Sequence, residues 1–575
     1  MRLRKTAALL LTLALLISVL PGCSDGIRGI DGIAWNEYDE LIGSIRAETD
    51  PGTRETLMHR AEDMLMQTEC VTPLFNYRDA YLQKSTLTGV FATHNGAKFF
   101  MYSDSGDTTV SAYLGQMPDS FDPALASTTE ALTIVENTFS GLFAHDAEGR
   151  IVPALAESFD VSSDGLTYTF TLHEGLLWSD GSDLDASDFI FSWRRAADAF
   201  TGSPYRYLFD IIARKEDGKL DITSDETDTV LTVKLAWPCS YFIELCAFPA
   251  FYPVNEDCVE SAEGYMDIYN NIIDPDAWTI RANYVTSGAF IFSGTADGKY
   301  IYKKNDNFYN AELMKIDTFE VSFGTDSEAE YEKYEAGELD YLGIIPTNLH
   351  DTLMGGDEYH SDDVNGVYFL AYNFNCRAFS GMYAADAANL RRAISLFIDR
   401  EYITSSVTKN GEAPATSVVP DGITSQGSRY RINTADHTYP FPDSRGYFAS
   451  STEANRAEAR EIIKALGMDE DDDGMIDTAY RFTLSYLTTN SATDIAIAQS
   501  IQQDLAELGI MVKVTAAEPR VFDFELSIYN YDVIALGSVS YYDDAQSVLE
   551  CWTTNATGNY ARLGSVVEEE DENAY

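Results

Sequence analysis

The stretch that decides the fold is residues 149–189, which read GRIVPALAESFDVSSDGLTYTFTLHEGLLWSDGSDLDASDF. After the turn at Asp164-Gly165, the apolar residues Tyr168, Phe170 and Leu172 alternate with threonines, as in a strand with one buried face. LLWS then ends at a second tight turn, Asp180-Gly181. The pattern predicts short strands bounded by tight turns.

The order of residues in this stretch, continued by FSWRRAADAF (191–200), closely resembles the signature of extracellular solute-binding protein family 5, the peptide- and nickel-binding proteins of ABC importers. Other segments resemble the same family in the same order, so the resemblance covers most of residues 104–562. These segments are FDPALASTTEALTIVENTFSGLF (121–143), TSGAFIFSGTADGKYIYKKNDNFYN (286–310), YNFNCRAF (372–379), LRRAISLFIDREYI (390–403) and NYDVIALGSVSYYDD (530–544).

The resemblance implies an α/β fold with two lobes, like that of periplasmic binding proteins (type II, cluster C). It also implies an extra subdomain and two strands that cross between the lobes and act as a hinge. Local patterns agree with an α/β chain. A helix is predicted over 491–508, with Ile497, Ile501 and Leu505 on one face, before Gly509 and the strand IMVKV. Another helix face is predicted from Leu390, Ile394, Phe397 and Ile398.

Residues 35–65, WNEYDELIGSIRAETDPGTRETLMHRAEDML, predict two amphipathic helices with a break at Asp50-Pro51. Together with the residues up to 91, they resemble the segment that follows the 530–544 motif in the family. Here that motif is followed by ATGNYARLGS and an acidic tail instead. We therefore expect a circular permutation in which the old ends are joined near residues 100–108. The alternative is a duplicated tail fused to the N-terminus.

The expected organisation follows from this order of segments. Lobe I comprises 79–141 and 276–370, the extra subdomain comprises 142–275, and lobe II comprises 371–562 with the permuted piece 35–78. The remaining expected segments are a signal peptide (1–22), a linker (23–34) and an acidic tail (563–575).

The N-terminus predicts export. MRLRK is a basic region, residues 6–20 form an apolar run too short for a confident membrane span, and LPGC (20–23) resembles the lipobox of bacterial lipoproteins. We expect lipidation at Cys23 and anchoring on the outer face of the cytoplasmic membrane, in the cell envelope. An ordinary cleaved signal is the alternative. The net charge of −53 argues against nucleic acid as a partner.

Enzyme and cofactor motifs are absent from the sequence: it contains no GxSxG, HExxH, GxGxxG or P-loop pattern, and we expect no cofactor. The strongest metal pattern is DEDDDGMID (469–477). Asp469, Asp471, Asp473 and Asp477 match calcium-ligand positions of an EF-hand loop, but Tyr480 stands where the closing glutamate belongs. We interpret this stretch as a solvated acidic turn and a weak calcium candidate.

Ligand-binding residues are predicted by matching family positions. Tyr205 in SPY (203–205) matches a tyrosine that contacts the peptide, and Gly537 matches the glycine of the strand that pairs with the ligand backbone. The family's tryptophan is Ser538 here, and the aspartate that takes the peptide's α-amine aligns with Tyr541. Asp543 is expected to replace it, with Asp544 pointing away. On lobe I, the predicted contacts are Ser127 and Thr129.

The resemblance implies a substrate-binding lipoprotein that captures oligopeptides between its lobes and delivers them to the transmembrane subunits of an ABC permease. We expect a monomer. Three alternatives stay open from the sequence: an oligosaccharide receptor of the same fold, a surface receptor or scaffold that does not transport, and an exported hydrolase.

Overall fold

The computed structural model describes residues 32–146, 150–269, 271–280 and 284–564. The predicted signal peptide, Cys23 and the acidic tail from residue 565 lie outside the described residues. Among the described helices, none combines the length and apolar character needed to cross a membrane.

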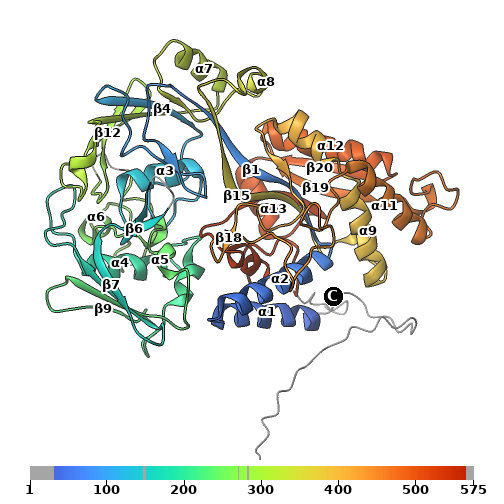
Figure 1. The fold of residues 1–575 in the computed structure, drawn as a ribbon, viewed down its shortest axis with the longest axis horizontal. Helices are drawn as coiled ribbons and strands as arrows, with labels where there is room; N and C mark the ends of the chain where they lie inside the picture. The colour runs from blue at the N-terminus through green and yellow to red at the C-terminus, as the bar shows by residue number, and fades with distance from the viewer. Residues whose placement is uncertain (1–31, 147–149, 270, 281–283, 565–575) are drawn as a thin grey trace, which may run out of the picture.

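One large mixed sheet runs through both lobes (Figure 1). The short strand β16 (Ala413–Pro414) also pairs with β1. The order of the other strands is β11 (Phe290–Ala296), β12 (Lys299–Lys304), β13 (Thr318–Phe323), β4 (Thr109–Gly115), β14 (Tyr341–Leu342), β1 (Val71–Gln83), β15 (Tyr359–Tyr372), β21 (Val533–Val539), β19 (Thr483–Thr489) and β20 (Met511–Ala517).

The two long strands β1 and β15 connect the lobes. They run antiparallel and side by side through the middle of the molecule, with Val71 opposite Ala371 at one end and Leu82 opposite Tyr359 at the other (Figure 1). Their register is interrupted between Pro73 and Phe75 and again between Asn76 and Arg78. The first part of β1 lies in lobe II and the last part in lobe I, with the second irregularity between them.

The extra subdomain is built on a separate four-stranded antiparallel sheet. In its strand β8 (Thr167–Leu172) the apolar residues are buried and the threonines half-buried, as the alternation predicts. The helix α4 (Ala186–Ala196) has a capping box made by Asp185 and Asp188. The other strands are β7 (Ala156–Val161), β9 (Ile222–Ser224) and β10 (Val230–Lys234), and the short helices are α5 (Phe242–Leu245) and α6 (Glu256–Glu260).

Lobe II carries helices that cover its part of the sheet. The predicted helix over 491–508 is α12 (Ala492–Glu507), capped by Ser491 and followed by β20. One prediction is wrong in detail: α9 (Ala384–Phe397) ends before Ile398, which has an extended backbone. Asp399 instead caps the next short helix through Tyr402 N. This lobe also contains α11 (Thr452–Ala465) and α13 (Pro519–Ser527).

The first two helices, α1 (Gly32–Ala47) and α2 (Pro51–Gln67), pack on lobe II. Asp50 caps α2 by accepting from Thr53 N at 2.9 Å, as predicted. The indole Nε1 of Trp35 donates to the carbonyl of Trp552 at 2.9 Å, and the Tyr38 hydroxyl donates to that of Leu549 at 2.7 Å. These contacts lie at α14 (Gln546–Leu549) and the turn after it, so the pair is an integral part of this core.

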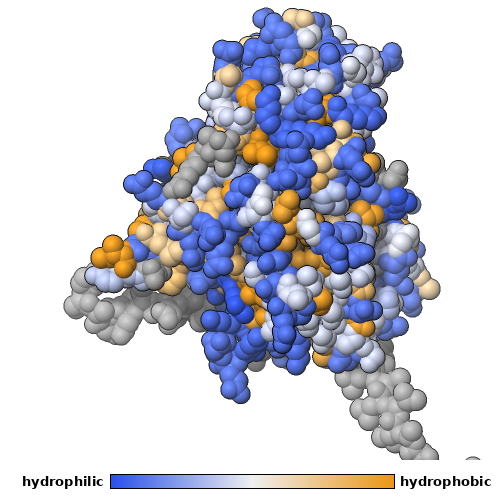
Figure 2. All heavy atoms as spheres, turned by 90° about the vertical axis from the view of Figure 1, so that its left-hand side faces the viewer, coloured by the Kyte–Doolittle hydropathy of each residue, from blue (hydrophilic) through white to orange (hydrophobic). Residues whose placement is uncertain are grey.

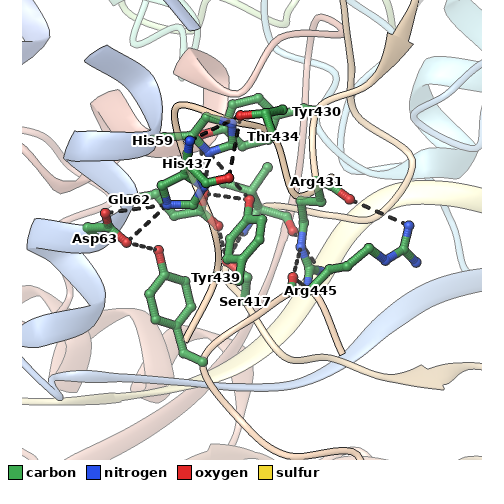
Figure 3. A network of polar contacts seen from close by, with 12 residues as sticks. His59, Glu62, Asp63, Ser417, Tyr430, Arg431, Thr434, His437, Tyr439 and Arg445 are labelled. Carbon is green, nitrogen blue, oxygen red and sulfur yellow. Dashed lines mark hydrogen bonds and ion pairs between the residues drawn. The ribbon is translucent and has the colours of Figure 1, made fainter. Parts of the chain in front are cut away.

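A buried polar network ties α2 to the 417–447 segment of lobe II (Figure 3). Glu62 has no exposed surface and accepts hydrogen bonds from Ser417, Tyr430 and Tyr439. The ring of His59 is stacked between Tyr430 and His437, with centroids 4.2 and 4.1 Å away. Since a buried carboxylate without these donors is costly, the network fixes α2 in place.

The face of lobe I and the extra subdomain in Figure 2 is dominated by hydrophilic side chains, with apolar ones in small separate groups. Lobe I is completed by β4, by α3 (Thr129–Thr138), and by the two helices α7 (Ser327–Glu335) and α8 (His350–Leu353).

Candidate binding site

Five of the predicted ligand-binding residues surround one cavity between the lobes. Ser127 and Thr129 reach it from lobe I, and Gly537, Ser538 and Tyr541 reach it from lobe II. The cavity has a volume of about 320 Å³. Pro204 and Tyr207 of the extra subdomain and Trp552 of lobe II also line it.

The lobe I wall is organised by the start of α3. The Thr128 hydroxyl caps this helix by accepting from Ala131 N. Asp119 stabilises the turn before α3, because its carboxylate accepts hydrogen bonds from the backbone N–H and the hydroxyl of both Ser127 and Thr128. The turn is thereby fixed with Thr129 on the cavity wall.

The lobe II wall is a strand with an open edge. On one side β21 pairs with β15 along its whole length, from Val533 to Val539. On the other side the described residues of β19 pair only with Val533 and Ile534. The remaining half of β21 therefore offers unpaired backbone groups at the cavity, which is the edge that an added strand needs.

Gly537 is required by the close approach of Tyr77. A Cβ at position 537 would lie 1.9 Å from the Tyr77 hydroxyl, and a Cβ at Gly366 would lie 2.8 Å from the same ring. Tyr77 therefore packs against two glycines on the paired strands β15 and β21, at the second register irregularity of β1. Its position couples the crossing of the lobes to the ligand strand.

A second cavity, of about 450 Å³, lies on the lobe I side of the same strand and shares Asn95, Thr129, Gly537 and Val539 with the first. Its wall carries charge. Lys98 is buried between Asp79 at 2.9 Å and Asp362 at 2.8 Å. Burial raises the pKa of Asp79, and the neighbouring ammonium group of Lys98 offsets part of this rise.

Tyr205 lies behind the first cavity rather than on its wall, which corrects the prediction that its side chain contacts a ligand directly. Its side chain has no exposed surface, and its hydroxyl donates to the Ala126 carbonyl at 2.6 Å. The rings of Phe248 and Tyr541 both pack edge-on against its ring, with centroids 4.9 and 5.0 Å from its own. Burial raises the pKa of Tyr205, so it remains a neutral support.

The two aspartates after Tyr541 are arranged differently from the prediction. Asp543 turns away from both cavities and accepts from Thr424 N at 2.8 Å and from Asn365 Nδ2 at 3.3 Å. Asp544, expected to matter little, forms a largely buried pair with Arg54 at 2.5 Å. The chain does not stay extended beyond Val539, so alternation of side chains fails there.

The sequence missed other residues of the walls. Tyr77, Phe369, Trp552 and Tyr560 come from segments with no local mark of a binding site. The signal that could have pointed to Tyr77 is an aromatic ring packed on strand glycines. This arrangement becomes visible only when β1 is placed in the sheet with β15 and β21.

The acidic loop is a self-capped turn. Asp469, Asp471 and Asp473 bring one oxygen each within 4.8 Å of one another. However, Asp469 already accepts from Asp473 N and Gly474 N, and the Tyr480 hydroxyl donates to Glu470 at 2.7 Å. Asp477 accepts from Glu470 N, so backbone amides occupy several of the carboxylates.

Comparison with known proteins gives a consistent result. The chain is 28% identical to the oligopeptide-binding protein OppA of Bacillus subtilis and 27% identical to the dipeptide-binding protein DppE of the same organism. These matches cover 79% of both chains for OppA, and 84% of this chain and 82% of the relative for DppE.

Solved structures share the two-lobed fold. OppA of Listeria monocytogenes, solved with peptide, gives a TM-score of 0.62 at 24% identity over 80% of this chain and 86% of that chain. The murein tripeptide binding protein MppA of Escherichia coli gives 0.61 at 23% identity over 79% and 84%. The predicted α/β periplasmic-binding-protein fold is confirmed.

A family model described as bacterial extracellular solute-binding proteins, family 5, matches residues 150–560. Members of this family bind solutes and are not enzymes, so the hydrolase alternative is set aside. The chain belongs to the bacterial extracellular solute-binding proteins of family 5.

Proposed function

We propose that this protein captures oligopeptides in the cleft between its lobes and delivers them to the transmembrane subunits of an ABC importer. The observation that carries the proposal is the open edge of β21, which faces two cavities walled by both lobes. An extended peptide added to this edge gains main-chain hydrogen bonds that do not depend on its sequence. The two cavities beside this edge then receive the side chains and the ends of the peptide.

The relatives support a peptide ligand. The Bacillus subtilis relatives are described as oligopeptide- and dipeptide-binding proteins, and the Listeria structure holds a peptide. In this chain, Ser127, Thr129, Gly537, Ser538 and Tyr541 are proposed ligand contacts, with Tyr205 as the support of Tyr541.

Strand addition is tested with peptides that are methylated at single backbone nitrogens. Calorimetry on a set of pentapeptides should show that methylation at alternate amides weakens binding, whereas side-chain exchanges matter less. Equal tolerance of methylation at every amide would contradict the proposal. Native mass spectrometry of freshly purified protein identifies the ligand that is carried through purification.

An oligosaccharide is the second candidate, because the first cavity combines Tyr207, Tyr541, Tyr560 and Trp552 with hydroxyl groups. Flat aromatic rings suit sugar faces. A glycan found by native mass spectrometry would favour this candidate over peptides. A bound ligand without uptake by cells would favour a receptor or scaffold that does not transport.

We infer lipidation at Cys23, anchoring in the cell envelope on the outer face of the cytoplasmic membrane, and a monomeric receptor. Metabolic labelling with an alkyne fatty acid should label the full-length protein and not Cys23→Ser. Labelling of both would place the lipid elsewhere.

We also infer that the chain is circularly permuted relative to its family. Supporting this, α1, α2 and the first half of β1 share one core with residues 367–563, and a Cβ at Gly564 would lie 2.8 Å from the ring of Trp35. A chain that starts at residue 104 and joins residue 564 to residue 35 by a short linker should fold and melt like the original. Failure of this rearranged chain to fold would count against the inference.

A further inference from the structure

The first cavity, here named the neutral chamber, is lined by the described residues Asn95, Ser127, Thr129, Leu132, Pro204, Tyr207, Phe369, Val418, Gly537, Ser538, Val539, Tyr541, Ser547, Val548, Cys551, Trp552, Thr557, Gly558 and Tyr560. None of these is Asp, Glu, Lys, Arg or His. This is notable in a chain with 92 acidic and 39 basic residues. Burial raises the pKa of Tyr541, and it raises that of Cys551 to about 12, so both stay neutral.

The carboxylates behind this wall are already occupied. Asp119 is held by the turn at Ser127 and Thr128. Glu550 pairs with Arg46 at 2.9 Å and accepts from the Tyr542 hydroxyl at 2.8 Å. A charged group that entered the neutral chamber would lose its water without gaining an ionic partner, which is costly.

The second cavity, here named the charged chamber, differs in this respect. Lys98 is matched by Asp79 and Asp362, and Arg78 is matched by Asp363 at 2.9 Å. Glu130 also lines this chamber, and no ion pair of the described residues includes it. Burial raises the pKa of Glu130, as expected for a carboxylate that lacks a cation.

The two chambers meet at Thr129, Gly537 and Val539, along the open edge of β21. A ligand that lies on this edge therefore reaches both. We propose that the ligand places an uncharged end group in the neutral chamber and a cationic group beside Glu130 in the charged chamber. This rests on the proposed function, and it names an end-blocked, basic peptide as the preferred class of ligand.

The end group is tested with one lysine-containing pentapeptide in four forms: unmodified, N-acetylated, C-amidated and doubly blocked. Calorimetry should show that blocking one end tightens binding by about tenfold or more, because an unpaired charge leaves the chamber. An unmodified peptide that binds as tightly as every blocked form would overturn the proposal. If none of the four binds, and native mass spectrometry finds a different kind of ligand, the proposed function fails and this proposal falls with it.

Two substitutions then place a charge in the neutral chamber. Ser538→Asp and Ser538→Lys should change the preference between free and blocked peptide ends in opposite directions, one toward the free end and the other away from it. The control Ser405→Asp on the surface should leave this preference unchanged. Unchanged preference in both Ser538 variants, with folding verified by their melting temperatures, would contradict the neutral-chamber assignment.

The cationic group is tested with Glu130→Gln. The wild type should bind the lysine peptide about tenfold more tightly than the same peptide with norleucine, and Glu130→Gln should remove this preference. The melting temperature of Glu130→Gln serves as the folding control. A lysine preference that survives in Glu130→Gln would overturn the assignment of Glu130.

Discussion

Gly537→Ala tests the contact between the ligand strand and the crossing strand β1. The new Cβ would lie 1.9 Å from the Tyr77 hydroxyl and 2.8 Å from its Cζ. The hydroxyl must retreat by roughly 1.5 Å to reach ordinary contact distance. Tyr77 cannot move freely, because its ring also packs against Gly366 of β15 and lies edge-on to Phe75.

Overpacking of this kind costs about 1–3 kcal/mol. We expect Gly537→Ala to lower the free energy of unfolding by that amount in urea titrations and to weaken ligand binding, since Tyr77 would be displaced toward the charged chamber that it lines. Tyr77→Phe removes the atom in closest conflict, so it should return part of the loss in the double variant. A matched control is Gly324→Ala, where a Cβ meets nothing within 4 Å.

The double-mutant cycle decides the matter. A coupling energy between positions 537 and 77 of at least about 0.5 kcal/mol is expected for residues in contact. If Gly537→Ala is as stable as Gly324→Ala and shows no coupling to Tyr77→Phe, the reasoning is refuted.

Four other outcomes are expected. Arg54→Met should lower the free energy of unfolding by about 3–5 kcal/mol because Asp544 is left largely buried without a cation, and Asp544→Asn in the same chain should recover part of the loss, as read from denaturant midpoints. Gly43→Ala, on the exposed face of α1 with nothing within 4 Å, should stabilise by about 0.5–1 kcal/mol, and no gain would show that α1 melts apart from lobe II. Burial raises the pKa of Glu244 to about 7 from its usual 4.5, so between these pH values the folded state retains a proton that the unfolded state has lost. Stability should therefore fall as the pH rises from 4.5 through 7. Glu244→Gln should flatten this slope in thermal melts measured across that pH range. Calcium should leave the melting temperature nearly unchanged, and a large calcium-dependent rise that Asp471→Ala abolishes would contradict the acidic-turn interpretation.

Local patterns in the sequence were sufficient for individual elements. The alternation at Tyr168, Phe170 and Leu172 predicted β8, and Asp50 with Pro51 predicted the start of α2, because strand periodicity and helix capping depend on neighbours in the chain. The resemblance of the ordered motifs predicted the family correctly, and five residues predicted from it, Ser127, Thr129, Gly537, Ser538 and Tyr541, line one cavity in the structure.

Side-chain direction beyond the ends of regular elements was decided only by the tertiary structure. Asp543 turns away from both cavities and Asp544 pairs with Arg54, because β21 ends at Val539 and the next residues are oriented by Thr424 and Arg54, which lie far away in the sequence. Tyr205 supports the wall for the same reason, since its surroundings come from other segments.

The charge of the binding site also emerged only in three dimensions. The sequence is strongly acidic, yet folding gathers an uncharged set of residues from both lobes and the extra subdomain around one chamber and leaves Glu130 without a cation in the next. Composition fixes the total charge of a chain. The positions of charges around a ligand depend on which distant segments the sheet and its crossing strands bring together.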